Sequence, residues 1–188
     1  VSSAASDVYK RQVQMLSVTQ TIPDHGEICE NNISGEFYMT KDILVRVRGT
    51  QTIGEEEDTV EMITPGTYYE KNGKQYFIYD ESLDETGEPT HNTVKIMENR
   101  IEVTKRGLVD SHMIFEPGKR TTANYRTPMG LFLMGITTSF LEIAEDEESI
   151  LLKIKYSMEM NGQYAFDCST EILASSKKDE VLGIVVKD

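Results

Sequence analysis

From residue 39 onward, hydrophobic and polar residues alternate with a period of two, and turn residues interrupt the alternation every 8 to 12 residues. In the first such segment, residues 42–49, the apolar Ile43, Val45 and Val47 share one face. Alternation of this kind places every second side chain on the buried face of a half-buried strand. Many short alternating segments separated by turns predict an all-β sandwich or barrel.

Two Asn-Gly pairs give the strongest hairpin signals, because both residues tolerate the positive φ of a two-residue type I′ turn. Asn72-Gly73 is expected to join strand 67–71 to strand 74–80, and Asn161-Gly162 is expected to join the last two long strands. The apolar face of these two strands contains Leu152, Ile154, Tyr156, Met158 and Met160, then Tyr164, Phe166, Cys168, Thr170 and Ile172.

Other boundaries rest on shorter signals. Pro65-Gly66 and Pro117-Gly118 predict turns, and Glu98-Asn99 predicts a further hairpin. Residues 130–141 fit either a helix or a strand, because Gly135 and neighbouring threonines weaken a helix. About ten strands result.

The predicted connections are short and suit an up-and-down antiparallel meander. Closure of eight or more such strands removes exposed sheet edges. We therefore expect an all-β fold, an antiparallel meander closed into a barrel of about 8–10 strands. A small barrel is either filled by its own side chains or holds one small ligand, so the function depends on which of the two applies.

The expected barrel domain spans residues 39–176. Residues 1–38 lack the alternation, and the first twelve (VSSAASDVYKRQ) resemble translated adapter DNA, so we expect a non-native or disordered extension there. Met39 and Met15 are both candidate starts, and residues 177–188 are expected to form a short tail.

The composition and net charge of the chain exclude several classes of function. The chain has 188 residues, a formal net charge of -13, no apolar run long enough to span a membrane, and no secretory signal. We therefore expect a cytoplasmic protein that binds neither nucleic acid nor membrane. Cys29 and Cys168 lack zinc-ligand spacing, and no Gly-rich phosphate loop is present, so neither a metal nor a cofactor is predicted.

Five segments in this order are similar to the bacterial YwiB-like family. They are residues 39–49 (MTKDILVRVRG), 64–69 (TPGTYY), 92–96 (NTVKI), 105–108 (KRGL) and 125–130 (YRTPMG). The resemblance covers roughly residues 39–175 and implies a calycin-like, lipocalin-type β-barrel of cytoplasmic bacterial proteins, most of them of unknown function. It implies no catalytic residues.

Charge and aromatic side chains indicate where a ligand would bind. Residues 95–126 contain seven basic and four acidic residues, whereas the segments on either side are strongly acidic. These cations either gather on one wall of the barrel or pair with acidic residues on neighbouring strands. The candidate ligand-binding residues are Tyr69, Tyr79, His112, Arg120, Tyr125, Arg126, Phe140 and Tyr156. Arg120 or Arg126 would attract an anionic group at the mouth of the barrel.

Three functions remain open. In the first, the interior binds a small, partly apolar or anionic ligand. In the second, a filled barrel presents the acidic clusters 55–58 and 145–148 to a basic protein partner. In the third, Tyr125, His112 and a carboxylate perform hydrolase-like or isomerase-like acid-base chemistry. The strand pattern by itself predicts an interior, hydrogen-bonded His112 and an inward-facing Cys168.

Overall fold

The structure is a computed structural model that describes residues 39, 41–82, 87 and 89–177. The expected extension 1–38 and almost all of the expected tail lie outside the described residues, and these two assignments stay predictions. The strands are β1 (Asp42–Ile53), β2 (Glu56–Lys71), β3 (Lys74–Glu81), β4 (Thr90–Met97), β5 (Arg100–Arg106), β6 (Asp110–Phe115), β7 (Arg120–Thr127), β8 (Gly130–Glu145), β9 (Ser149–Met160) and β10 (Gln163–Ser176).

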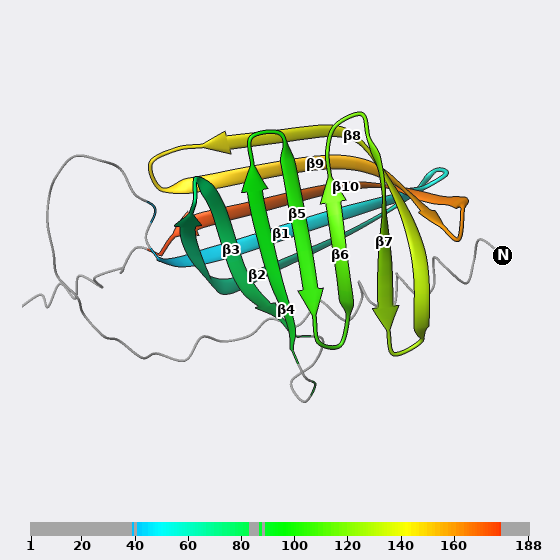
Figure 1. Cartoon of the computed structure of the whole chain (residues 1–188), viewed down its shortest axis with the longest axis horizontal. Coiled ribbons are helices and arrows are strands. Elements are labelled where there is room, and N and C mark those ends of the chain that lie inside the picture. The colour runs from blue at the N-terminus through cyan, green and yellow to red at the C-terminus, as the bar shows by residue number, and fades with distance from the viewer. Residues whose placement is uncertain (1–38, 40, 83–86, 88, 178–188) are drawn as a thin grey trace, which may run out of the picture.

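The ten strands of the described residues form one closed antiparallel barrel. Each strand pairs with its neighbours in the sequence, and β1 closes the barrel by pairing with β10 from Ile43↔Ser176 to Thr52↔Asp167. The long strands β8, β9, β10, β1 and β2 form one wall, and the shorter strands β3 to β7 cross in front of them (Figure 1). The predicted all-β fold and closed meander are confirmed, and residues 130–141 belong to a strand.

Both Asn-Gly hairpins are confirmed. Asn72 and Gly73 have φ of 55° and 65°, and Asn161 and Gly162 have φ of 50° and 80°. Positive φ at both central residues is what a type I′ turn requires. These turns set the register of β2 with β3 and of β9 with β10.

The predicted turn at Pro65-Gly66 is wrong, because both residues lie inside β2. This long strand pairs with β1 over residues 56–67 and with β3 only over residues 66–71, so Gly66 lies where the strand passes from one wall to the other. A Cβ at Gly66 would lie 2.8 Å from the Ile78 carbonyl oxygen and 2.8 Å from Val45 Cγ2. The glycine therefore permits close packing of strands.

We predict that Gly66→Ala lowers the free energy of unfolding by about 1 to 3 kcal/mol, because the added methyl overpacks this crossing. Gly49→Ala is the matched control, since a Cβ at Gly49 would meet nothing within 4 Å. Urea denaturation of both variants measures the difference. Equal stability of the two variants would contradict the prediction.

Two β-bulges reverse which side chains face inward. In β8, Thr138 pairs with Tyr156 but Phe140 pairs with Lys155, so the register shifts between them. Thr138 is buried, whereas Phe140 is 43% exposed and lies under Lys155 Nζ, 6.0 Å from the ring centroid. A similar shift in β10 turns Tyr164 outward before Phe166 turns inward. Simple alternation fails at both positions, because a bulge inserts one extra residue.

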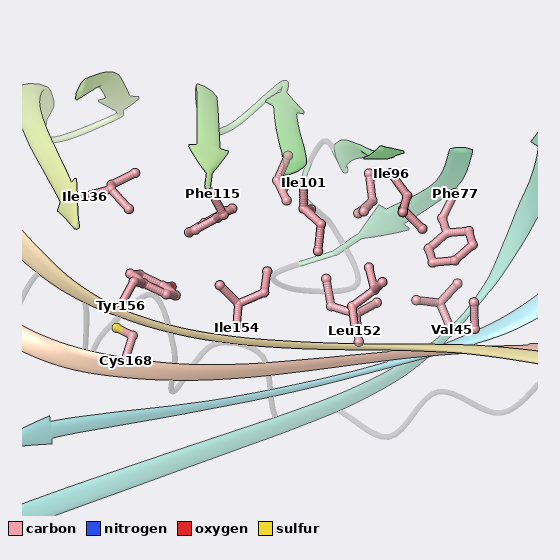
Figure 2. Packing of buried hydrophobic residues seen from close by; sticks show 14 of the residues in the cluster. Val45, Phe77, Ile96, Ile101, Phe115, Ile136, Leu152, Ile154, Tyr156 and Cys168 are labelled. Atoms are coloured by element: carbon pink, nitrogen blue, oxygen red, sulfur yellow. The ribbon is translucent and has the colours of Figure 1, made fainter. Parts of the chain in front are cut away.

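The core lies between the two walls, where inward-facing apolar side chains meet (Figure 2). Leu152, Ile154 and Tyr156 point inward, as the alternation predicted. Cys168 is buried beside them, and its burial raises the pKa of the thiol to about 12. The thiol therefore acts as a small apolar filler, as predicted. No helix among the described residues is long and apolar enough to cross a membrane.

Candidate ligand-binding cavity

The barrel interior is not completely filled. A cavity of about 150 Å³ lies between the two walls. Its apolar lining includes Val47, Met62, Val103, Phe115, Ile154 and Met158, and its polar lining includes Gln51, Asp58, Tyr79, Glu81, Lys105 and Tyr125. This combination of a mostly apolar surface with a few polar groups is typical of small-molecule sites.

The cavity becomes polar where several inward-facing rows of side chains end. In β5, Ile101 and Val103 are buried, and Lys105 follows them on the same face. In β3, Tyr79 is followed on the same face by Glu81. Every second residue still faces inward beyond the last apolar residue of each strand, so these charged side chains lie inside the barrel.

Lys105 and Glu81 form an ion pair inside the barrel. Lys105 Nζ lies 2.5 Å from Glu81 Oε2, and the two side chains are only 20% and 11% exposed. The two residues flank β4, where the buried Asn92 donates a hydrogen bond from Nδ2 to the same Glu81 oxygen at 3.2 Å. The carboxylate is therefore held by two donors.

The protonation states around this pair follow from burial and from neighbouring charge. Burial alone would lower the pKa of Lys105, but the Glu81 carboxylate outweighs this effect and raises that pKa above its ordinary range. Burial raises the pKa of Tyr79 to about 12, and burial also raises the pKa of Tyr125. At neutral pH Lys105 is thus an ammonium, and Tyr79 and Tyr125 are neutral phenols.

An aromatic contact joins the two walls across the interior. Phe115 of β6 and Tyr156 of β9 have ring centroids 4.9 Å apart at an interplanar angle of 56° (Figure 2). The Tyr156 hydroxyl lies 3.4 Å from Thr170 Oγ1 on the neighbouring strand. Tyr156 therefore gives the cavity both an apolar ring and a polar tip.

The structure brings only part of the predicted site together. Tyr79, Tyr125 and Tyr156 line the cavity. Tyr69 lies on the outer surface, where its ring stacks on that of Tyr76 with centroids 4.7 Å apart. Phe140 also faces outward, because of the β8 bulge.

Arg120 and Arg126 do not reach the interior. Both are exposed, whereas Ala123 and Thr127, at positions of the opposite parity in β7, are buried. Arg120 Nη2 contacts Glu159 Oε2 on the outer surface at 2.7 Å. The positive charge inside the barrel is supplied by Lys105 instead of either arginine.

The prediction of an interior His112 is wrong. Its side chain is exposed on the outer face of β6, where Nδ1 lies 2.9 Å from Thr104 Oγ1. Tyr125 faces the cavity, so the structure does not place these two residues in one acid-base site. Within the described ranges, no group of three or more His, Cys, Asp and Glu residues is arranged to hold a metal ion.

The basic segment 95–126 does not form one positive wall. Its cations pair with carboxylates, as in Lys95–Glu102 at 3.3 Å, Arg100–Glu102 at 2.7 Å, Lys119–Glu116 at 2.5 Å and Arg120–Glu159 at 2.7 Å. The alternative interpretation, pairing with acidic residues, therefore describes this segment better.

The acidic clusters 55–58 and 145–148 lie at opposite ends of the long strands (Figure 1). Glu57 pairs directly with Thr52 of β1. Glu145 pairs with Ile150 of β9, which pairs with Ala174 of β10, and Ala174 pairs with Val45 of β1, so Glu145 lies at the level of Val45. Seven residues of β1 separate these levels, which is about 23 Å. The two clusters thus do not make one contact surface.

Comparison with known proteins agrees with this architecture. Residues 45–172 match the family described as Domain of unknown function (DUF1934). The chain belongs to this family. The "Uncharacterized beta-barrel protein YwiB" of Bacillus subtilis (strain 168) is 29% identical over 107 residues, which cover 57% of this chain and 74% of that protein.

A solved structure shows the same fold. The crystal structure of the ywiB protein from Bacillus subtilis matches with a TM-score of 0.65 and 23% identity, covering 73% of this chain and 93% of that chain. The family predicted from the five sequence segments is confirmed, and the relative is described as a β-barrel without an assigned activity. The lipocalin-type relationship stays an implication of the resemblance.

Among the cavity residues of this DUF1934 chain that were absent from the predicted site are Gln51, Glu81 and Lys105. The alternation contained a signal for each of them. Gln51 has the parity of Val45 and Val47 in β1, and Lys105 has the parity of Val103 in β5. Polar residues that continue an inward-facing apolar row are candidates for an interior site.

Proposed function

We propose that the barrel binds a small, mostly apolar and uncharged molecule in its interior. The observation that supports this most directly is the cavity of about 150 Å³, lined mainly by apolar side chains and bordered by a polar group around Lys105. An apolar cavity of about this size in another protein stays dry and binds benzene. The interior therefore suits a compact ligand or one end of a longer molecule.

The charges of the cavity favour a neutral ligand over an anionic one. Lys105 is already neutralised by Glu81, and Asp58 adds a further carboxylate to the lining. The exposed Arg120 and Arg126 cannot attract an anion into the interior from the outer face. An anionic ligand would have to compete with Glu81 for the only cation among the described lining residues.

Gly49 offers a direct test, because it lines the cavity and a Cβ there would meet nothing within 4 Å. We predict that Gly49→Leu fills the cavity, raises the free energy of unfolding by about 2 kcal/mol, and abolishes ligand binding. Thermal unfolding of the wild type and the variant, with a library of small neutral aromatic and aliphatic compounds, measures both effects.

Thr50→Leu is the matched control, since Thr50 is the next residue of β1 and faces outward, with Oγ1 2.9 Å from Thr59 Oγ1. This variant should keep the ligand-induced stabilisation of the wild type. The proposal fails if no compound stabilises the wild type, or if the same compounds stabilise Gly49→Leu equally well.

A further inference from the structure

One level of the barrel interior carries polar side chains on four of five neighbouring strands, and the buried thiol of Cys168 lies between them. The register places these residues side by side, from β2 through β1, β10 and β9 to β8: Asp58, Gln51, Cys168, Tyr156 and Thr138. We refer to them as the polar row. The neighbouring level, formed by Phe166, Met158 and Ile136, is apolar. The polar row is therefore a local feature of the barrel interior.

Two members of the polar row have polar atoms without a partner. Gln51 is only 4% exposed, and its Nε2 has no hydrogen-bond partner among the described residues; the same holds for Thr138 Oγ1. Leaving a buried donor unpaired costs stability, so such groups in native proteins call for an explanation. Gln51 is also one of the residues that line the cavity, so its amide lies close to the cavity wall.

Asp58 supplies the complementary group next to this donor. It pairs with Gln51 across β1 and β2, and it also lines the cavity. Side chains directly opposite each other on one face of an antiparallel pair have Cβ atoms about 5 Å apart. The cavity wall thus presents an N–H donor beside a carboxylate acceptor.

A ligand that satisfies both groups needs an acceptor next to a donor, which is the pattern of an amide. We propose, resting on the binding function above, that the barrel recognises a neutral primary amide with a compact apolar body, because its carbonyl oxygen and one of its N–H groups lie on the same side of the molecule. Its carbonyl oxygen accepts a hydrogen bond from Gln51 Nε2, and its N–H donates to the Asp58 carboxylate. The apolar body lies among side chains such as Val47, Met62 and Phe115.

The test compares benzamide with isopropylbenzene, which has the same number of heavy atoms and no polar group. Both are titrated into the ¹⁵N-labelled full chain and its variants, and NMR chemical shifts give the dissociation constants. Gln51→Leu removes the donor at similar volume. We expect this variant to bind benzamide about tenfold more weakly, with isopropylbenzene affinity unchanged within about twofold.

Two further readouts locate the effect. In the wild type, benzamide should shift the side-chain NH₂ signal of Gln51 more than isopropylbenzene does. Asp58→Asn removes the carboxylate and should improve the binding of benzoate relative to the wild type, because benzoate no longer meets this negative charge. Thr50→Val, on the outer face of β1, is the matched control and should bind both probes as the wild type does.

The possible results separate this proposal from the binding function itself. If neither probe binds the wild type or Gln51→Leu, the amide proposal fails, and the binding function fails as well if no compound of the library above stabilises the wild type. If isopropylbenzene binds but benzamide does not, or if Gln51→Leu leaves benzamide affinity unchanged, the amide proposal alone is overturned. A selective loss of benzamide affinity in Gln51→Leu supports both.

Discussion

Replacing Lys105 with methionine should lower the free energy of unfolding by about 3 to 5 kcal/mol. The Glu81 carboxylate would then remain inside the barrel without the ammonium that now lies 2.5 Å away. Asn92 would still donate one hydrogen bond to it, but a neutral donor does not replace the lost charge. Guanidinium denaturation of the full chain at pH 7 measures the loss.

Two variants identify the cause of this loss. Removing both charges in Lys105→Met/Glu81→Leu should recover most of the stability, because no buried charge is left unpaired. Lys153→Met is the control for a surface pair, since Lys153 and Glu142 are 39% and 45% exposed and their charged atoms lie 3.6 Å apart. It should cost less than about 1 kcal/mol. Similar losses in the two lysine variants would contradict the buried-pair interpretation.

The barrel should also lose stability steeply at alkaline pH. Burial raises the pKa of Cys168 from an ordinary value of 9.0 to about 12, and burial raises the pKa of Tyr79 from 10.0 to about 12. Above pH 9 the unfolded chain therefore releases protons that the folded chain keeps. Because the unfolded state then binds fewer protons, the free energy of unfolding falls as pH rises.

The pKa shifts of these residues set the pH range and the size of the expected loss of stability. The stabilisation is complete below about pH 9 and declines toward pH 12, by up to roughly 1.4 kcal/mol per pH unit for each group. Lys105 acts in the same direction, because its raised pKa keeps it charged in the folded state after the unfolded lysine has lost its proton.

Urea denaturation between pH 7 and 11 tests this prediction. Cys168→Ala should flatten the decline that begins near pH 9, whereas Tyr79→Phe should flatten it only from about pH 10 upward. The two variants thus act as controls for each other. Unchanged slopes in both variants would show that other groups cause the alkaline sensitivity.

Alternation and turn chemistry predicted much of this fold because each is a local property with a direct geometric consequence. The apolar rows of β1, β9 and most of β10 face inward as expected, and both Asn-Gly pairs form hairpins with positive φ. The errors lie where one residue changes the geometry. A bulge turned Phe140 outward, and Gly66 allows close strand contact inside β2.

The candidate site was less predictable, because it depends on which strands lie next to one another and in what register. Alternation alone is compatible with an inward-facing Lys105 or Glu81, but their pairing across β4 follows only from the registers of three strands. The outward direction of Arg120 likewise follows from the buried Ala123 at the opposite parity of β7. The basic segment 95–126 led to the prediction that Arg120 or Arg126 attracts a ligand, whereas the cation that lines the cavity is Lys105.

The partial pairing of β2 has a consequence for how molecules exchange with the interior. Among the described residues, β2 pairs with β1 over residues 56–67 but with β3 only from Gly66 onward. Asp58, Val60 and Met62 line the cavity from this singly bonded stretch. Because this stretch has a hydrogen-bonded neighbour on one side only, we expect it to open locally at a lower free energy than global unfolding. A bound ligand should accordingly enter and leave the interior faster than the protein unfolds globally.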